Sequence, residues 1–139
     1  MNEQNNKALV EKLYAAFGRG DLQTILDHLA PNVEWTMEGP STLPFAGKKI
    51  GPGQVRTFFE ALATTQENQK LTVDDYIVQG DKVATTGRYS AVVKATGKRF
   101  DCAVAHVFTI RDGKVAKFLD FVDTAQMADA YVSAAAASR

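Results

Sequence analysis

Residues 99–122, RFDCAVAHVFTIRDGKVAKFLDFV, decide the fold. Two long runs of mainly apolar residues flank the turn Arg111-Asp112-Gly113, a composition typical of a β-hairpin. Two ionisable residues, His106 and Asp120, interrupt these runs. Because a buried ionisable group without a partner is costly, we expect both residues either to be tightly paired or to carry out chemistry.

The apolar pattern changes its period after Asn68, from near four to two. The first part predicts the order helix, helix, strand, helix, and the second predicts a meander of four antiparallel strands and a closing helix. Residues 38–53, which are rich in proline and glycine, are predicted to form a long loop. The expected helices carry apolar stripes at 9–17, 22–29 and 55–62, the strands cover 33–37, 71–78, 83–94, 98–110 and 114–122, and the closing helix covers 125–136.

Helices followed by a run of strands indicate an α+β domain, with the helices packed on one face of a curved sheet. A chain of 139 residues can bury one hydrophobic core, so residues 1–139 are predicted to form a single domain. The other sheet face is nearly as apolar, and too little chain remains to cover it. We therefore expect a homodimer through the outer sheet face. The residues assigned to that face are Val83, Tyr89, Ala91, Val93, Ala103, Ala105, Val107, Val115, Leu119 and Phe121.

Composition argues against several classes of partner. Lys plus Arg and Asp plus Glu number 16 each, with no long run of either sign, so no nucleic-acid partner is expected. No apolar stretch is long enough to span a bilayer and the first residues are polar, so we expect a cytoplasmic protein without membrane contact. Cys102 is the only cysteine, which excludes an internal disulfide and favours an inert buried thiol.

The length of the turn at Asp112-Gly113 decides whether His106 and Asp120 meet. A two-residue turn would place them on opposite faces of the sheet, whereas a three-residue loop would make them diagonal neighbours on one face. We favour the three-residue loop because it aligns the large apolar residues of both strands on one face. The same loop length in the preceding hairpin would set Arg88, Val104 and Asp120 in a row across three adjacent strands.

Asp120, His106 and Arg88 are the candidate catalytic residues, because this register brings all three to the floor of a concave sheet face. Apolar side chains would form the walls, which is the usual composition of a small-molecule pocket, and we expect a small hydrophobic ligand. The alternative is structural: a cross-strand ion pair of Arg88 with Asp120, a core histidine and packing aromatic rings. The expected wall residues are Tyr14, Trp35, Phe58, Phe100, Phe108 and Phe118.

A carboxylate in an apolar cavity has its ionised form disfavoured, which strengthens it as a base. Asp120 could therefore abstract a proton next to a carbonyl group or activate a water molecule, while Arg88 or His106 stabilises the developing oxyanion. The sequence contains no serine-nucleophile motif, phosphate loop, dinucleotide fingerprint or histidine pair at metal-binding spacing, so we expect no cofactor and no metal. The alternative function is a non-catalytic binder of a small hydrophobic ligand.

Four segments carry a family resemblance: LYAAFGRGDLQTILDHLAPNVEW (13–35), GPGQVRTFFEAL (51–62), VQGDKVATTGRYSA (78–91) and ATGKRFDCAVAHVFTIRDGKVAKFLDFVDT (95–124). Together they resemble the SnoaL-like branch of the NTF2-like superfamily, which includes ketosteroid isomerases, small polyketide cyclases and limonene-type epoxide hydrolases. The resemblance implies an NTF2-like, or cystatin-like, cone with three N-terminal helices packed on a curved antiparallel sheet and a closing C-terminal helix. It also implies one pocket that members use for many reactions or for none.

Carried over by position, the resemblance implies roles for three residues. Asp120 matches the acid/base aspartate on the last strand of the cyclases and epoxide hydrolases, and His106 matches a pocket histidine of the cyclases. Arg88 matches the arginine of the epoxide hydrolases, but their second aspartate falls on Ser90. The base of the ketosteroid isomerases would fall at Met37, so the match is closest to the cyclases.

Overall fold

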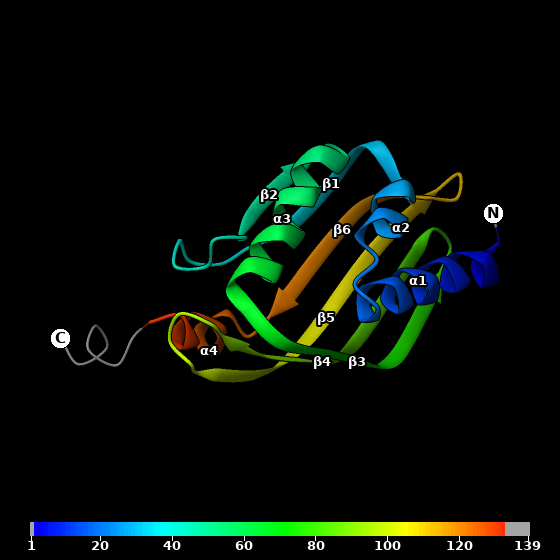
Figure 1. Ribbon diagram of the computed structural model, residues 1–139. Coiled ribbons are helices and arrows are strands. Elements are labelled where there is room, and N and C mark those ends of the chain that lie inside the picture. The colour runs from blue at the N-terminus through cyan, green and yellow to red at the C-terminus, as the bar shows by residue number, and fades with distance from the viewer. Residues whose placement is uncertain (1, 133–139) are drawn as a thin grey trace.

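The structure, a computed structural model, describes residues 2–132, and in this part the helices and strands follow the predicted α+β order (Figure 1). The predicted fold class is confirmed. The elements are α1 (Glu3–Gly18), α2 (Leu22–Asp27), β1 (Leu29–Met37), β2 (Gly47–Ile50), α3 (Gly51–Thr65), β3 (Gln66–Gln79), β4 (Lys82–Val93), β5 (Arg99–Arg111), β6 (Lys114–Val122) and α4 (Thr124–Ala130).

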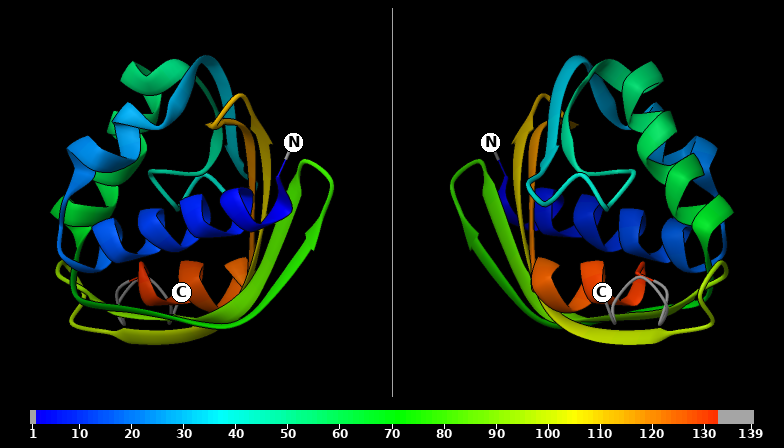
Figure 2. Two further views of the ribbon diagram at one scale, coloured as in Figure 1. Left: turned by 90° about the vertical axis from the view of Figure 1, so that its right-hand side faces the viewer. Right: turned by 90° about the vertical axis from the view of Figure 1, so that its left-hand side faces the viewer.

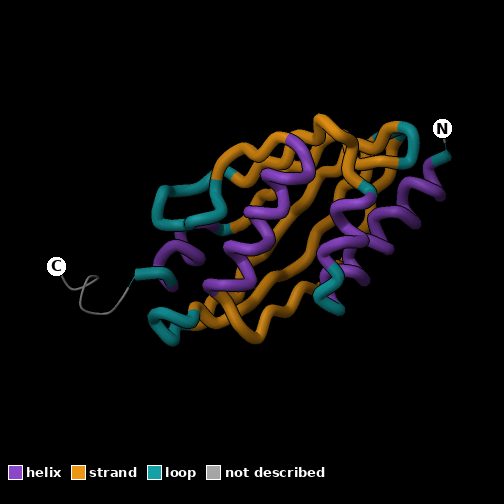
Figure 3. Tube along the Cα trace, turned by 45° about the horizontal axis from the view of Figure 1, so that its top comes forward, coloured by secondary structure: helices purple, strands orange, loops and turns teal. Residues whose placement is uncertain are grey.

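The six strands form one sheet in the order β2-β1-β6-β5-β4-β3. Neighbouring strands are antiparallel except β1 and β6, which run parallel. Both views of Figure 2 show the sheet curving around the side on which α1, α2 and α3 lie. In Figure 3 the long strands pass behind these helices, and α4 packs on β5. The helices therefore enclose the concave face and leave the outer face of the sheet uncovered.

Side-chain caps set the start of three of the helices. Asn2, Asp21 and Asp123 each accept a hydrogen bond from the backbone N–H three residues later, at the first turns of α1, α2 and α4. Helix α3 begins without a side-chain cap, and Pro52 occupies its first turn, where the missing N–H costs nothing. These local signals fix where the helices enter the space above the sheet.

The hydrophobic core lies between the concave face and the helices. Val10 and Leu13 of α1 and Val55 and Phe58 of α3 point into it, and each is at most 4% exposed. Complete burial of one such side chain contributes about 1.5–3 kcal/mol to stability. The largest fully buried side chains include Phe45, Phe100, Met37 and Ile110. No helix within residues 2–132 is long and apolar enough to cross a membrane.

Three sequence predictions about the elements were wrong. Residues 38–53 are not a continuous loop, because they contain β2, which pairs with β1. The sheet is not wholly antiparallel, because β1 adds to β6 in parallel. β3 starts at Gln66, well before the predicted start at Leu71. The closing helix ends at Ala130, and the part of its prediction at 133–136 lies outside the described residues.

The predicted three-residue loop between β5 and β6 is also wrong. Arg111 pairs with Lys114 across a two-residue turn, Asp112-Gly113, in which both φ angles are positive (53° and 73°). One step further the register shifts, because Val115 pairs with Ile110 and Lys117 pairs with Thr109. Ala116 is therefore an extra residue, a β-bulge. The bulge shifts the register by one further residue, so His106 pairs directly with Asp120, two positions from the predicted partner Phe118, and both side chains lie on one face.

The register predicted for Arg88 is wrong by one residue. In the hairpin of β4 and β5, Val92 pairs with Arg99, so Arg88 pairs with Ala103 and Val104 pairs with Gly87. A one-residue slip moves every side chain of a strand to the opposite face. Arg88 therefore lies on the outer face, where its Nε donates a 2.9 Å hydrogen bond to Asp101 Oδ1. It takes no part in the concave floor.

The division of apolar residues between the two sheet faces differs from the prediction. Five residues assigned to the outer face are buried in the interior: Val83, Tyr89, Ala91, Val93 and Val115. The outer face is nevertheless apolar over the middle of the sheet. Phe121 on β6 is 55% exposed and Ile77 on β3 is 61% exposed, and smaller apolar side chains of β4, β5 and β6 lie between them.

Candidate active site

A cavity of about 80 Å³ lies between the concave sheet face and helices α1 and α3. Aromatic and aliphatic side chains make up almost all of its lining, and His106 and Asp120 are the ionisable groups among them together with two tyrosines. Five of the six predicted wall residues line it: Tyr14, Trp35, Phe58, Phe108 and Phe118. The sixth, Phe100, does not line the cavity; it is 2% exposed and packs on Tyr89 with ring centroids 5.7 Å apart.

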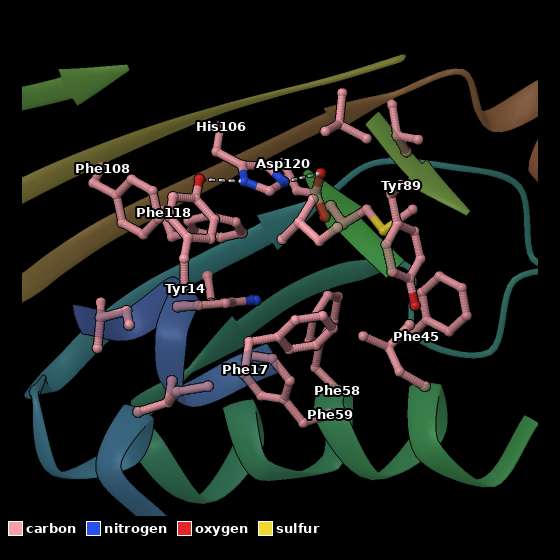
Figure 4. Close-up of a pocket in the computed structure, with 18 of the residues that line it drawn as sticks. Tyr14, Phe17, Phe45, Phe58, Phe59, Tyr89, His106, Phe108, Phe118 and Asp120 are labelled. Atoms are coloured by element: carbon pink, nitrogen blue, oxygen red, sulfur yellow. Dashed lines mark hydrogen bonds and ion pairs between the residues drawn. The ribbon is translucent and has the colours of Figure 1, made fainter. Parts of the chain in front are cut away.

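His106 and Asp120 face each other on the floor of this cavity (Figure 4). His106 Nε2 lies 3.2 Å from Asp120 Oδ1, and the two side chains are only 10% and 14% exposed. This is an ion-pair distance, but Oδ1 makes no aligned hydrogen bond. The bulge at Ala116 therefore brings the side chains of His106 and Asp120 within contact distance, because it pairs these two residues directly.

Tyr14 of helix α1 connects His106 to the next strand. Its hydroxyl oxygen lies 2.7 Å from His106 Nδ1 and 2.6 Å from Thr85 Oγ1 on β4. Burial raises the pKa of Tyr14 far above its usual range, so the phenol stays neutral. The sequence placed Tyr14 only in the wall, because its position on the apolar stripe of a helix carries no sign of a hydrogen bond to a residue so distant along the chain.

Asp120 is the last of this series of side chains, and it determines which atoms of the others carry the protons. When Asp120 is ionised its carboxylate only accepts hydrogen bonds, so the proton of His106 resides on Nε2, facing Asp120. Nδ1 of the neutral imidazole is then an acceptor, and the Tyr14 hydroxyl donates to it. The Thr85 hydroxyl donates in turn to the Tyr14 oxygen. Thr85, Tyr14 and His106 thus form one directed hydrogen-bonded line, and at its end His106 Nε2 faces Asp120 Oδ1 at 3.2 Å without an aligned hydrogen bond.

The wall beside Asp120 is a stack of aromatic rings. Trp35 of β1 lies over Phe118 of β6 with ring centroids 3.9 Å apart and an interplanar angle of 25°. Phe58 meets Trp35 edge-on at 5.9 Å, and Phe108 packs against Phe118 at 4.9 Å. Such pairs are rigid and contribute about 0.5–1.5 kcal/mol each beyond the burial of their area. In this wall Trp35 and Phe118 are nearly parallel, and Phe58 and Phe108 are inclined to them.

Other lining residues were missed by the sequence analysis. Phe17 of α1 and Phe59 of α3 are half-buried and face the floor from the helices in Figure 4. Both lie on the apolar stripes of predicted helices, which was the available signal, but spacing alone does not separate a cavity wall from a packed core. Tyr89 lines the other end of the cavity, and it had been assigned to the outer face.

Tyr89 belongs to a polar cluster that is fully paired. Its hydroxyl donates to Gln66 Oε1 and accepts from Gln69 Nε2 at 2.8 Å, while Gln66 Nε2 donates to the Tyr131 hydroxyl at 2.8 Å. Burial raises the pKa of Tyr89 well above its ordinary value. Because these groups satisfy one another, the cluster serves to join β3, β4 and the segment after α4.

Neither a metal site nor a reactive thiol is built from the described residues. Within residues 2–132, no three His, Cys, Asp or Glu side chains gather in a way that could hold a metal ion. Cys102 is 1% exposed, and burial, together with nearby Asp123 and Asp101, raises the pKa of its thiol to about 11. Its predicted burial is confirmed. The chemistry of the cavity is therefore that of a carboxylate, an imidazole and a phenol, which together can move a proton.

Comparisons with known proteins agree with this fold. The SnoaL-like domain family matches residues 10–118. An NTF2-like protein of unknown function from Burkholderia pseudomallei is 30% identical, with a TM-score of 0.87 over 96% of this chain and 100% of that chain. An NTF2-like protein from Burkholderia thailandensis is 34% identical, with a TM-score of 0.83 over 94% and 98%. TerC, co-crystallised with polyporic acid, is 27% identical, with a TM-score of 0.83 over 91% and 98%. No curated protein matches the chain.

Proposed function

Because this chain belongs to the SnoaL-like domain family, within the NTF2-like superfamily, we propose that it moves a proton on a small apolar cyclic carbonyl compound, with Asp120 as general acid/base. One observation carries the proposal. The largely buried carboxylate of Asp120 lines an apolar cavity, and its Oδ1 lies 3.2 Å from the imidazole Nε2 of His106 without forming an aligned hydrogen bond. A carboxylate oxygen that makes no hydrogen bond in such a place can take a proton from a ligand.

The proposed step uses only groups that the chain supplies. Asp120 removes a proton from the carbon next to the carbonyl group, and the electrons of the broken C–H bond form an enolate. The protonated Asp120 then returns this proton to another carbon, which completes an isomerisation, or to the alkoxide formed when the enolate carbon attacks a second carbonyl group. His106, oriented by Tyr14, holds the carboxylate in place through both halves of the reaction.

The size of the cavity sets a condition on this proposal. Ligand pockets usually begin at about 300 Å³, so a cavity of about 80 Å³ has to widen before a ring enters. Phe17 and Phe59, whose ring centroids lie 6.2 Å apart on α1 and α3, are the half-buried rings of the helical wall. Rotation of these side chains would widen the cavity without disturbing the sheet. The co-crystal of TerC with polyporic acid supports a small organic ligand for this chain too.

Proton abstraction can be tested without knowledge of the natural substrate. The probe is 2-tetralone, a ring ketone, whose exchange of the protons next to the carbonyl group is followed by proton NMR in heavy water. We expect the protein to accelerate this exchange, and Asp120→Asn to lower the acceleration by about a hundredfold or more, because the base is lost. Binding of 2-tetralone to the variant should persist, as measured by the fluorescence of Trp35, the only tryptophan.

The matched control is Asp101→Asn, the same change at a half-exposed position on the outer face of β5. This variant should exchange protons at the wild-type rate. Equal rates for wild type and Asp120→Asn would contradict the role of Asp120. Binding of the ketone by the wild type without any exchange would instead assign the chain to the non-catalytic binders.

A further inference from the structure

We infer that the indole N–H of Trp35 is the hydrogen-bond donor for the substrate's oxygen, and that the cavity selects flat ring compounds with a carbonyl group at one edge and an acidic C–H or O–H group at another. This inference rests on the proposed function, since it gives the partner of Asp120 in the same site. It starts from the two polar atoms that the cavity leaves unpaired.

The two unpaired atoms are a donor and an acceptor. Among the buried side-chain nitrogen and oxygen atoms of the described residues, Trp35 Nε1 and Asp120 Oδ1 are those without a hydrogen-bond partner, although Oδ1 lies 3.2 Å from His106 Nε2. Trp35 is 4% exposed, and both residues line the cavity. Buried polar groups are almost always paired in native proteins, so an unpaired one calls for an explanation. A ligand with one acceptor and one donor would satisfy both atoms at once.

The other donors around the cavity are already engaged. Arg88, expected to stabilise an oxyanion, lies on the outer face with Asp101. The nitrogens of His106 face Asp120 and Tyr14, and the Tyr14 hydroxyl bridges His106 and Thr85. An enolate that forms in front of Asp120 develops its negative charge on oxygen and needs a donor in a dry environment. In the described part of the lining, the indole N–H of Trp35 is the unused one.

The sheet register places this donor beside the base. In the parallel pair of β1 and β6, Trp35 is opposite Phe118 and Met37 is opposite Asp120. Trp35 and Asp120 are therefore diagonal neighbours on one face, with backbones about 7–8 Å apart. The stack of Trp35 on Phe118 holds the indole plane, and with it the direction of the N–H bond. A flat ring can lie along this wall with its oxygen toward Trp35 and its acidic proton toward Asp120.

The movement of electrons during proton abstraction shows how the indole N–H of Trp35 would assist the step. When Asp120 takes the proton, the C–H electrons form a carbon–carbon double bond and the carbonyl π electrons move onto the oxygen. The hydrogen bond from Trp35 Nε1 to that oxygen is stronger in the enolate than in the ketone, because the acceptor has become negative. No oxidant, reductant or metal enters the balance. Phenols that carry a carbonyl group fit the same pair of atoms without reacting.

The test compares two phenols that differ in the carbonyl oxygen. 4-Hydroxyacetophenone carries both the acceptor and the donor, whereas 4-ethylphenol has a similar shape and lacks the acceptor. The chain has one tryptophan, so a nitrogen-15-labelled sample gives one indole N–H resonance, that of Trp35. We expect 4-hydroxyacetophenone to move this proton resonance downfield on binding, and 4-ethylphenol to leave it without a downfield shift. This comparison needs no substitution in the core.

The second arm uses Trp35→Phe, which keeps a flat aromatic ring and removes the N–H group. Calorimetry should show that the variant binds 4-hydroxyacetophenone about five- to tenfold more weakly relative to 4-ethylphenol than the wild type does, the usual effect of one hydrogen bond. The ratio between the two ligands removes the effect of lost ring area. Binding of 4-ethylphenol by the variant also serves as its folding control.

The outcomes separate this inference from the proposed function. A bound carbonyl ligand that leaves the indole proton unmoved, or equal ratios for wild type and Trp35→Phe, would overturn the role of Trp35 and leave Asp120 as the base. Failure of both phenols to bind the wild type would overturn the ligand class. Neither result decides the exchange experiment with 2-tetralone, which tests Asp120 separately.

Discussion

His106 lies directly opposite Asp120 because β6 contains one residue more than β5 between their turn and this pair. The turn by itself would leave the two side chains on opposite faces of the sheet. Ala116, the bulged residue, shifts the register by one and returns both to the concave face. The candidate site is thus created by a local irregularity in the hairpin.

Removal of the Tyr14 hydroxyl should weaken both the fold and the order of the site. In Tyr14→Phe, the buried Thr85 hydroxyl and His106 Nδ1 lose their common partner, so we expect the free energy of unfolding to fall by about 1–2 kcal/mol. Urea unfolding measures this loss. Tyr76→Phe is the control, because the Tyr76 hydroxyl makes no hydrogen bond with the described residues, and its effect should stay within about 0.5 kcal/mol. Nitrogen-15 NMR of the wild type should show His106 protonated on Nε2; a proton on Nδ1 would contradict the directed line.

Gly87 should tolerate no side chain. A Cβ atom at this position would lie 1.9 Å from the carbonyl oxygen of Thr72, so the backbones of β3 and β4 would have to separate. Gly87→Ala is expected to lower the free energy of unfolding by about 3 kcal/mol or more, or to prevent folding. Gly18→Ala is the control, since a Cβ there meets nothing within 4 Å, and it should leave stability unchanged or slightly raised. Similar urea midpoints for the two variants would show that the strands are further apart than described.

The exposed apolar patch on the outer sheet face remains the predicted dimer interface. We propose that a second copy of the chain covers Phe121 and Ile77, because the middle of this face is apolar and no element of the described chain packs on it. Phe121→Lys should convert a dimer to a monomer in analytical ultracentrifugation. Thr57→Lys, on an exposed position of α3, adds the same charge away from the patch and should leave the dimer intact. A monomeric wild type would refute the proposal.

The thiol of Cys102 should be unreactive in the folded protein. Its pKa is raised to about 11, chiefly by burial, so only a very small fraction is thiolate at pH 8. Alkylation by iodoacetamide at pH 8 should be slow in buffer and fast in concentrated urea, and the rate in buffer should rise as the pH approaches 11. Mass spectrometry follows the modification. Equal rates in buffer and urea at pH 8 would show an accessible thiol.

The sequence predicted those features that depend on neighbouring residues. Apolar spacing located the helices, and Gly-containing turns located the hairpins, because both signals arise within a few residues. The pairing register of the strands was harder to predict. β5 and β6 are apolar on both faces, so alternation alone did not fix which residues oppose each other. Asp112-Gly113 is a typical two-residue turn sequence, but the bulge at Ala116 has no strong local signature. The predicted register of Arg88 was wrong by one residue, so this predicted catalytic residue lies outside the site.

Long-range features had no signal in the sequence. The segment Gly47–Ile50 is short and partly polar, and it becomes β2 only because β1 offers it a free edge. The hydrogen bond of Tyr14 joins residues that are far apart in the chain and close only after the sheet has curved. Aromatic residues of the cavity wall carried the same pattern as core residues, so Phe100 and Phe17 could not be assigned correctly from spacing.

The parallel pairing of β1 with β6 bears on how the chain is made. During synthesis β1 leaves the ribosome early, whereas β6 is among the last strands to follow. Trp35 and Met37 therefore have no pairing partners until Phe118 and Asp120 have been synthesised. Contacts between distant parts of a chain form late in folding, because closing the long loop costs entropy. A chain that stops before β6 would lack the base and leave the indole unsupported. The two halves of the site can therefore meet only after β6 has been synthesised.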